Sequence, residues 1–341
     1  MEKNTLIQKS LLSVVCFIII IAALKASVAI VVPFLLSIFI AFICHTPLAW
    51  LKKRGFNTYT AVATIVAAVV GISFAIAGVV GKSIDSFTLA LPGYQEKILQ
   101  STHKIIEYIS IYDINVSLDF ITAYLDPTFF MLLVSNTLTG FGGALTDFVL
   151  ILFTVIFILS ESSDFTKKIE KIFINNSSTL ENYKIFFENV NKYLAIKTVL
   201  SLLTGVLVAL LLLFFNVDYP LLWALIAFLF NYIPNIGSIL AALPVLLLAS
   251  VTHTFTELTL ILLGYIVINV SVGNIIEPKY MGRKLDLSSL VVFVSLIFWG
   301  WVLGPVGMLL SIPLTMIVKI AAENNNKTKW ISILLSASDR P

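Results

Sequence analysis

The chain has 341 residues, of which 59% are apolar and 12% are charged, and its formal net charge is +3. Soluble domains average about 45–50% apolar and about 25% charged residues, so this chain has too few charges to cover a water-exposed surface. The small net charge gives no indication of a nucleic-acid partner. Cys16 and Cys44 lie inside apolar stretches, which favours packing or lipid contact over redox or metal chemistry. The composition indicates an all-α, polytopic membrane protein.

Apolar stretches long enough to cross a bilayer recur along the chain. A helix needs ~20 residues to cross a ~30 Å hydrocarbon core. The stretches that qualify are residues 10–28, 33–51, 59–81, 141–160, 198–215, 221–252, 256–276 and 288–320. Pro33 is expected in the first turn of the second helix. The pattern predicts about eight transmembrane segments or hairpins.

Two of these stretches do not fit a single crossing. Residues 221–252 and residues 288–320 each contain two prolines, and each is too long to cross once yet barely long enough to cross twice. We therefore expect a broken hairpin in each. With a cytoplasmic N-terminus and both hairpins returning to their own side, 18 of the 22 Lys and Arg residues are cytoplasmic. The positive-inside rule predicts such an asymmetry, which places both termini in the cytoplasm.

The spans divide the chain into six segments. They are N-terminal transmembrane helices (1–81), an extracytoplasmic amphipathic segment with a helix opened by Pro92-Gly93 (82–140), a transmembrane helix (141–160), a cytoplasmic amphipathic segment (161–197), a C-terminal transmembrane core with both hairpins (198–320) and a cytoplasmic tail (321–341). Each amphipathic segment is suited to the bilayer surface, to an oligomer contact, or to simple packing on its own bundle.

Motifs that mark enzymes are missing from the sequence. The nearest approach to a phosphate-binding loop is Gly78–Ser83, but that loop requires glycine where Ile76 stands. The S-x-x-K pattern at Ser101–Lys104 lacks its companion motifs. The three histidines are far apart, with no metal-ligand spacing. We therefore expect neither an enzyme nor a cofactor or metal.

Polar residues and backbone breaks within the apolar stretches are the candidate functional features. Irregular backbone at membrane depth is tolerated only where it lines a cavity or is buried in protein, and paired Pro/Gly-interrupted segments indicate a transporter binding site. Residues 231–237, running to Pro244, and residues 304–307, running to Pro313, form such a pair. Simple hairpin turns are the alternative interpretation.

The helix between the two hairpins carries further polar groups. Asn274 and Glu277 are three residues apart and share a helix face, and Asn269 lies earlier in the same helix. Asparagine in contact with lipid is costly, so these side chains either bind a solute or form hydrogen bonds between helices. The candidate substrate- or ion-binding residues are Asn231, Pro234, Asn235, Gly237, Asn269, Asn274 and Glu277. The candidate hinge residues are Pro244, Pro278, Gly282, Gly304, Pro305, Gly307 and Pro313.

Two carboxylates are candidates for coupling transport to an ion. Asp147 lies several residues inside the fourth apolar stretch, although an interfacial aspartate at a helix start is the alternative. Glu277 is the second candidate. Its alternative role is an ion pair with Lys279, Arg283 or Lys284.

An ordered set of motifs covers most of the chain. The set comprises Pro234-Asn235-Ile236-Gly237 with Pro244, Ile276-Glu277-Pro278 with Gly282, Gly304-Pro305-Val306-Gly307 with Pro313-Leu314, and more loosely Pro33, Thr46-Pro47-Leu48, Lys52-Lys53-Arg54-Gly55 and Leu91-Pro92. In these motifs the chain resembles the autoinducer-2 exporter family of bacterial membrane proteins. The resemblance implies a homo-oligomeric transporter of the bacterial inner (cytoplasmic) membrane.

Three functions remain open at this point. The leading hypothesis is a secondary transporter that exports a small polar solute, such as the quorum-sensing signal autoinducer-2. The alternative is a Na⁺(Li⁺)/H⁺ antiporter, so the partners expected are the lipid bilayer and either a polar solute or a monovalent cation and proton. A non-transporting scaffold that acts through residues 82–140 or 162–197 is the third.

Overall fold

The computed structural model of the protein describes residues 2–110, 147–172, 177–234, 236–281, 287–323 and 328–337. All regular secondary structure in these ranges is helical. The chain divides into two compact units. Unit 1 comprises Met1–Val66, Val149–Ala195 and Met281–Pro341, and unit 2 comprises Ala67–Phe148 and Ile196–Tyr280.

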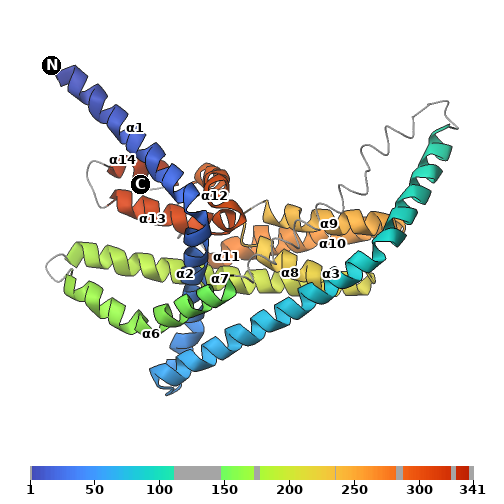
Figure 1. Ribbon diagram of the computed structural model, residues 1–341, viewed down its shortest axis with the longest axis horizontal. Coiled ribbons are helices and arrows are strands. Elements are labelled where there is room, and N and C mark those ends of the chain that lie inside the picture. The colour runs from blue at the N-terminus through green and yellow to red at the C-terminus, as the bar shows by residue number, and fades with distance from the viewer. Residues whose placement is uncertain are drawn as a thin grey trace. The chain divides into compact units, whose positions relative to one another are not determined.

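Unit 1 is built from the two ends of the chain and a central piece. Its helices are α1 (Glu2–Ala26), α2 (Val28–Lys53), the start of α3 (Thr58–Ser110), α6 (Phe148–Ile172), the first half of α7 (Ser177–Phe214), α12 (Ser289–Leu309), α13 (Ser311–Glu323) and α14 (Lys329–Leu335). Helix α12 packs against α1, α2 and α13, and α14 packs against α13 (Figure 1).

Unit 2 contains the rest of α3 and α7, followed by five consecutive helical elements. These are α8 (Pro220–Phe230), α9 (Gly237–Thr252), α10 (Phe255–Asn269), the π-helix η1 (Val270–Ile276) and α11 (Glu277–Met281). Its apolar core includes Leu212 of α7, Trp223 of α8, Leu248 of α9 and Ile261 of α10. These four side chains are at most 1% exposed, so α7 to α10 share one packed interior.

Five described helices are long and apolar enough to cross a membrane. They are Val28–Lys53, Thr58–Ala90, Phe187–Phe214, Phe255–Tyr280 and Ser289–Leu309, and shorter apolar helices cover Phe148–Glu161, Pro220–Phe230 and Gly237–Thr252. Many large apolar side chains on them are exposed, among them Phe74, Phe157 and Phe214, as expected of surfaces that face lipid. The predicted all-α, polytopic membrane protein is confirmed.

Two predicted helix starts are wrong. Pro33 lies inside α2, because α2 begins at Val28, directly after α1. The backbone N–H of Ser27 donates to the last turn of α1, and its carbonyl oxygen accepts from the first turn of α2. Pro92 does not open a helix either, since α3 runs through it from Thr58 to Ser110. A proline inside a helix removes one hydrogen bond. Phe87 and Tyr94, on either side of Pro92, belong to the same core of unit 2, and this packing keeps the two halves in one helix.

Candidate functional site

Both stretches predicted to be broken hairpins are pairs of packed helices. In the first, α8 ends at Phe230, α9 begins at Gly237, and the two helices pack together (Figure 1). In the second, the helical backbone of α12 breaks at Gly304 (φ 69°, ψ −154°), and α13 folds back along α12. The indole Nε1 of Trp299 donates to Thr315 Oγ1 at 3.0 Å across this second pair. The hairpin prediction is confirmed.

A glycine allows close backbone packing at the tip of each hairpin. A Cβ atom on Gly237 would lie 1.8 Å from the carbonyl oxygen of Phe230, and one on Gly307 would lie 2.0 Å from that of Trp299. The same added atoms would lie 3.0 Å from Ile233 Cβ and 2.8 Å from Leu303 Cβ, in each case four residues before the glycine. The two tips therefore use glycine in the same way, although they belong to different units.

A hydrogen bond joins the two flanks of the first hairpin, and another joins the start of the second hairpin to α14. His253, after α9, donates from Nε2 to the carbonyl oxygen of Phe215, before α8, at 2.9 Å. The backbone N–H of Ser288, before α12, donates to the carbonyl oxygen of Leu335 at 3.2 Å, and Leu335 lies in the helix packed on α13. The first hairpin therefore ends at the level at which it starts, and α14 lies beside the start of the second.

Helix α7 carries three buried polar side chains within an apolar span. Lys197, Ser201 and Thr204 are 3%, 0% and 2% exposed. Their spacing of four and then three residues places them on one helix face. We call these three residues the polar stripe of α7. Polar side chains inside a membrane span mark transport pathways or bonds between helices, so this face is the centre of the candidate site.

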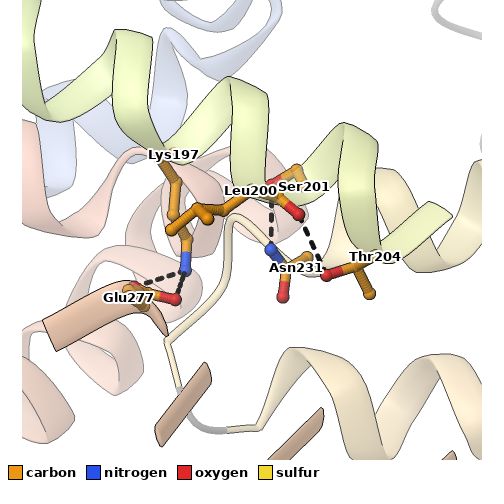
Figure 2. Close-up of polar contacts among 6 residues, drawn as sticks. All are labelled: Lys197, Leu200, Ser201, Thr204, Asn231 and Glu277. Carbon is orange, nitrogen blue, oxygen red and sulfur yellow. Dashed lines mark hydrogen bonds and ion pairs between the residues drawn. The ribbon is translucent and has the colours of Figure 1, made fainter. Parts of the chain in front are cut away.

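Residues from two other parts of unit 2 meet the polar stripe (Figure 2). The Nζ atom of Lys197 lies 2.7 and 2.8 Å from the two carboxylate oxygens of Glu277. The Nδ2 group of Asn231, at the end of α8, donates to Ser201 Oγ at 3.0 Å. Thr204 donates to a carbonyl of its own helix, Leu200 O, at 3.0 Å. The stripe thus connects the break of the first hairpin with the end of the π-helix.

The neighbouring residue Tyr232 makes a second contact between the hairpin break and α7. Its hydroxyl donates to Thr198 Oγ1 at 2.8 Å. Tyr232 is 3% exposed and Asn231 is 9% exposed. Two consecutive residues of the break are therefore held by hydroxyl groups of α7.

Glu277 owes its position to the π-helix η1. The Glu277 N–H donates to Val272 O, five residues earlier, which is the π-helical spacing. Pro278 follows directly in α11, and because it has no N–H it cannot donate to the preceding π-helical turn. The Glu277 side chain is 21% exposed and that of Lys197 is 4% exposed, so the carboxylate is the more accessible partner. π-Helical turns are frequent at functional sites.

Of the predicted binding residues, Asn231 and Glu277 come together at the polar stripe. Asn269 is half-buried, Asn274 is exposed within η1, and Pro234 is half-buried in the turn between α8 and α9. Glu277 pairs with Lys197, a residue that the predicted alternatives do not include. Asn235 and Gly282, as well as Arg283 and Lys284, lie outside the residues that the structure describes.

The other candidates lie apart from these contacts. Asp147 is exposed and directly precedes α6. Pro244 lies inside α9, Pro305 directly follows the break at Gly304, and Pro313 lies in the first turn of α13. Pro278 is exposed in α11.

Sequence reasoning missed the polar stripe itself. Lys197 is the last residue of the predicted cytoplasmic segment 161–197, at the edge of the apolar stretch 198–215. In the structure, α7 continues through this position from Ser177 to Phe214. The signal was the spacing of Lys197, Ser201 and Thr204, which places them on one face of an otherwise apolar helix.

The arrangement offers groups that can bind a polar solute or a cation. Lys197 and Asn231 supply hydrogen-bond donors, and Glu277 and Ser201 supply acceptors. Within the described ranges, no group of three or more His, Cys, Asp or Glu side chains is placed to hold a metal ion.

Comparison with known proteins finds relatives along nearly the whole chain. The family described as "AI-2E family transporter" matches residues 14–327. The chain is 38% identical over 319 residues to the AI-2 transport protein TqsA of Escherichia coli (strain K12), covering 94% of the chain and 93% of the relative. A putative transport protein of Haemophilus influenzae is 38% identical, with 98% of each chain covered. The putative transport protein YhhT of Escherichia coli (strain K12) is 33% identical, covering 95% and 93%.

Proposed function

The chain belongs to the AI-2E transporter family and is a multi-pass membrane transporter, and from this premise we propose that it is a secondary transporter that exports a small polar solute such as AI-2. The observation that carries the proposal is the buried Lys197–Glu277 pair beside the Asn231–Ser201 hydrogen bond. We also propose a homo-oligomer in the bacterial inner membrane, with both termini in the cytoplasm and no enzymatic activity.

The free-energy cost of a charged side chain inside a membrane span is the reason to connect these residues with transport. A charged side chain at the bilayer centre costs about 2.5–3.5 kcal/mol on insertion scales, and such residues pair with each other and line solute pathways. A scaffold gains nothing from a lysine that is 3% exposed inside a membrane span or from a break between two short apolar helices. A transporter uses both, because broken helices free backbone groups for the solute.

The groups at the polar stripe suit a small hydroxylated solute. Asn231 and Ser201 already form a donor–acceptor bond, which the hydroxyl groups of a solute can replace with bonds of their own. Lys197, one turn away on α7, adds a charged donor, and its partner Glu277 in α11 adds a charged acceptor. The name of the relative TqsA supports AI-2 as the solute.

A second candidate function, Na⁺(Li⁺)/H⁺ antiport, is favoured by one observation. Both carboxylate oxygens of Glu277 face the same cationic nitrogen, that of Lys197. A monovalent cation could take the place of this ammonium group when a proton leaves. Glu277 is a better coupling group than Asp147, which is exposed at the start of α6.

Flux in proteoliposomes that contain only this protein tests the proposal. AI-2 efflux and Na⁺-driven proton movement are followed in the same vesicles for the wild type, Glu277→Gln and Lys197→Met. Glu170→Gln serves as the matched control, because Glu170 forms an exposed ion pair with Lys184. We expect AI-2 efflux that both site variants abolish and the control retains.

The other outcomes are equally informative. Proton movement without AI-2 efflux would select the antiporter. Absence of both fluxes in protein that inserts and assembles normally would contradict both transport assignments.

A further inference from the structure

The short helix α14 at the end of the described chain has one exposed apolar side. Trp330 is 60% exposed, and Ile333 and Leu334 are each 67% exposed. Lys329 is exposed as well. At about 100° per residue these four side chains occupy one continuous arc of about 140°. The apolar face of α14, defined by Trp330, Ile333 and Leu334, therefore points away from the helices on which α14 packs.

The opposite side of α14 is fixed to both ends of the second hairpin. Ser332 is 5% exposed, and α14 packs against α13 (Figure 1). The carbonyl oxygen of Leu335 accepts the N–H of Ser288, the N-cap residue of α12, at 3.2 Å. Thr328, directly before α14, donates from Oγ1 to Ala322 O of α13 at 2.8 Å. The helix is thus held in a defined orientation relative to α12 and α13.

The position of α14 relative to the bilayer follows from these bonds. Helix α12 is long and apolar enough to span the membrane and begins at Ser289. Ser288 therefore lies near the membrane surface, and its bond to Leu335 places α14 at the same depth. With seven residues, α14 is about 10 Å long and cannot cross the hydrocarbon core.

The helices of the second hairpin also expose large apolar side chains. Leu290 and Ile297 of α12 and Ile317 of α13 are 71%, 56% and 51% exposed, as expected where a span faces lipid. Tryptophan is enriched at the headgroup level, and a lysine at the edge of an apolar face can extend to the phosphates. Both residue types are present here, as Trp330 and Lys329.

We infer that α14 is a membrane-surface anchor, with Trp330, Ile333 and Leu334 seated at the boundary between lipid headgroups and acyl chains. Its occupant is the bilayer itself. Through Ser288 and α13 the anchor sets the depth of the base of the second hairpin. The inference does not depend on which solute is carried.

Spin labels on single cysteines test the inference in full-length protein reconstituted into phosphatidylcholine–phosphatidylglycerol nanodiscs. Labels are placed at Ile333→Cys and Leu334→Cys after Cys16 and Cys44 are replaced by alanine. Lys329→Cys is the polar-edge control, and Ile297→Cys, in the α12 span, is the deep control. Accessibility to oxygen, which partitions into lipid, is compared with accessibility to a water-soluble nickel chelate.

We expect labels at positions 333 and 334 to lose nickel accessibility and to gain oxygen accessibility relative to position 329. Their depth should be shallower than that of position 297. Full nickel accessibility at 333 and 334 would overturn the anchor, because the face would then lie in water. Protection from both reagents would overturn it too, since a second copy of the chain would then cover the face.

A second measurement reads out the structural role of the anchor. Ile333→Asn combined with Leu334→Asn should increase the mobility of a label at Ser288→Cys. The matched pair Val199→Asn and Leu202→Asn, on exposed positions of α7, should leave that mobility unchanged. Equal mobility at position 288 in all backgrounds would contradict the role in fixing the hairpin base.

Discussion

The ammonium group of Lys197 lies 2.7 and 2.8 Å from the two carboxylate oxygens of Glu277, a residue 80 positions later in the chain. The contact joins two of the helices that are long enough to span the membrane, Phe187–Phe214 and Phe255–Tyr280. Because the lysine side chain is 4% exposed, it has little access to water that could replace the carboxylate if the pair is broken. The ion pair therefore couples the position of α7 to that of the segment that contains η1 and Glu277.

Removing one partner of this pair should be more harmful than removing both. Loss of one member of a buried ion pair costs about 3–5 kcal/mol, because the remaining charge is left without compensation. We expect Lys197→Met and Glu277→Gln each to lower the unfolding temperature in detergent. The double variant should regain part of the loss, since glutamine and methionine leave no charge behind. A double-mutant cycle of thermal unfolding measures the coupling.

An exposed ion pair in the same chain provides the control. Lys184 and Glu170 lie 2.7 Å apart with side chains 56% and 45% exposed. Solvent-exposed pairs contribute about 0–1 kcal/mol, so Lys184→Met should barely change the unfolding temperature. If Lys197→Met lowers the unfolding temperature no more than Lys184→Met does, the buried pair contributes no more to stability than an exposed pair.

The hairpins were predictable from the sequence, and the reason is physical. Residues 221–252 and 288–320 are too long for one crossing, and each contains proline and glycine, which weaken a helix where they occur. Asn231 and Glu277 were found because an amide or a carboxylate in an apolar stretch needs a partner in any fold. Local composition is enough for predictions of this kind.

The polar stripe could not be found in the same way. Lys197 at the edge of an apolar stretch is indistinguishable by composition from a loop lysine that obeys the positive-inside rule. Whether Lys197 is buried depends on how far α7 extends towards the N-terminus and on which residue of the neighbouring helix faces it. The partner, Glu277, follows a π-helix, and the extra residue of a π-turn shifts which side chains face a neighbour.

Alanine at the glycine of either hairpin tip should be strongly destabilising. The added methyl group of Gly237→Ala would lie 1.8 Å from Phe230 O, and that of Gly307→Ala 2.0 Å from Trp299 O. Both obstacles are backbone atoms, so the hairpin helices must separate. Overpacking of this kind costs about 1–3 kcal/mol or more. We expect lower unfolding temperatures and lower yields of folded protein in detergent.

Gly78→Ala in α3 is the matched control for the tip variants. No heavy atom lies within 4 Å of the added Cβ at this position. Alanine in a helix interior is favoured over glycine by about 0.8–1.0 kcal/mol, so this variant should be as stable as the wild type or more so. Tip variants as stable as Gly78→Ala would show that the helices do not approach as closely as the structure indicates.

Gly304→Ala should be destabilising for a different reason. There is space for the side chain, since no heavy atom lies within 4 Å of an added Cβ. The backbone conformation, with φ 69° and ψ −154°, is one that only glycine adopts readily. A strained residue of this kind costs about 1–3 kcal/mol. Chemical unfolding in mild detergent, compared with Gly78→Ala, measures the cost, and an unchanged stability would mean that the helix is not broken at this residue.

Tyr94→Phe tests the contact at the turn between α7 and α8. The Tyr94 hydroxyl donates to Asp218 Oδ2 at 2.8 Å, and the turn contains two non-glycine residues with positive φ, Asn216 at 54° and Tyr219 at 60°. A hydrogen bond to a charged group contributes about 1.5–3 kcal/mol, so the variant should lower the free energy of unfolding by an amount of this order. Tyr59→Phe is the control, because Tyr59 is 84% exposed.

The same contact gives a pH dependence with a defined sign. Tyr94 follows the span Thr58–Ala90, and burial, followed by the hydrogen bonds that its hydroxyl makes to Tyr219 and Asp218, raises its pKa well above the usual value of 10.0. Above pH 10 the unfolded chain loses this proton and the folded chain keeps it, so stability falls as the pH rises. Below pH 10 the contribution is fully present. Unfolding measured between about pH 8 and 11 should therefore show a steeper alkaline loss in the wild type than in Tyr94→Phe, whereas equal slopes would mean that the phenol ionises freely in the folded protein.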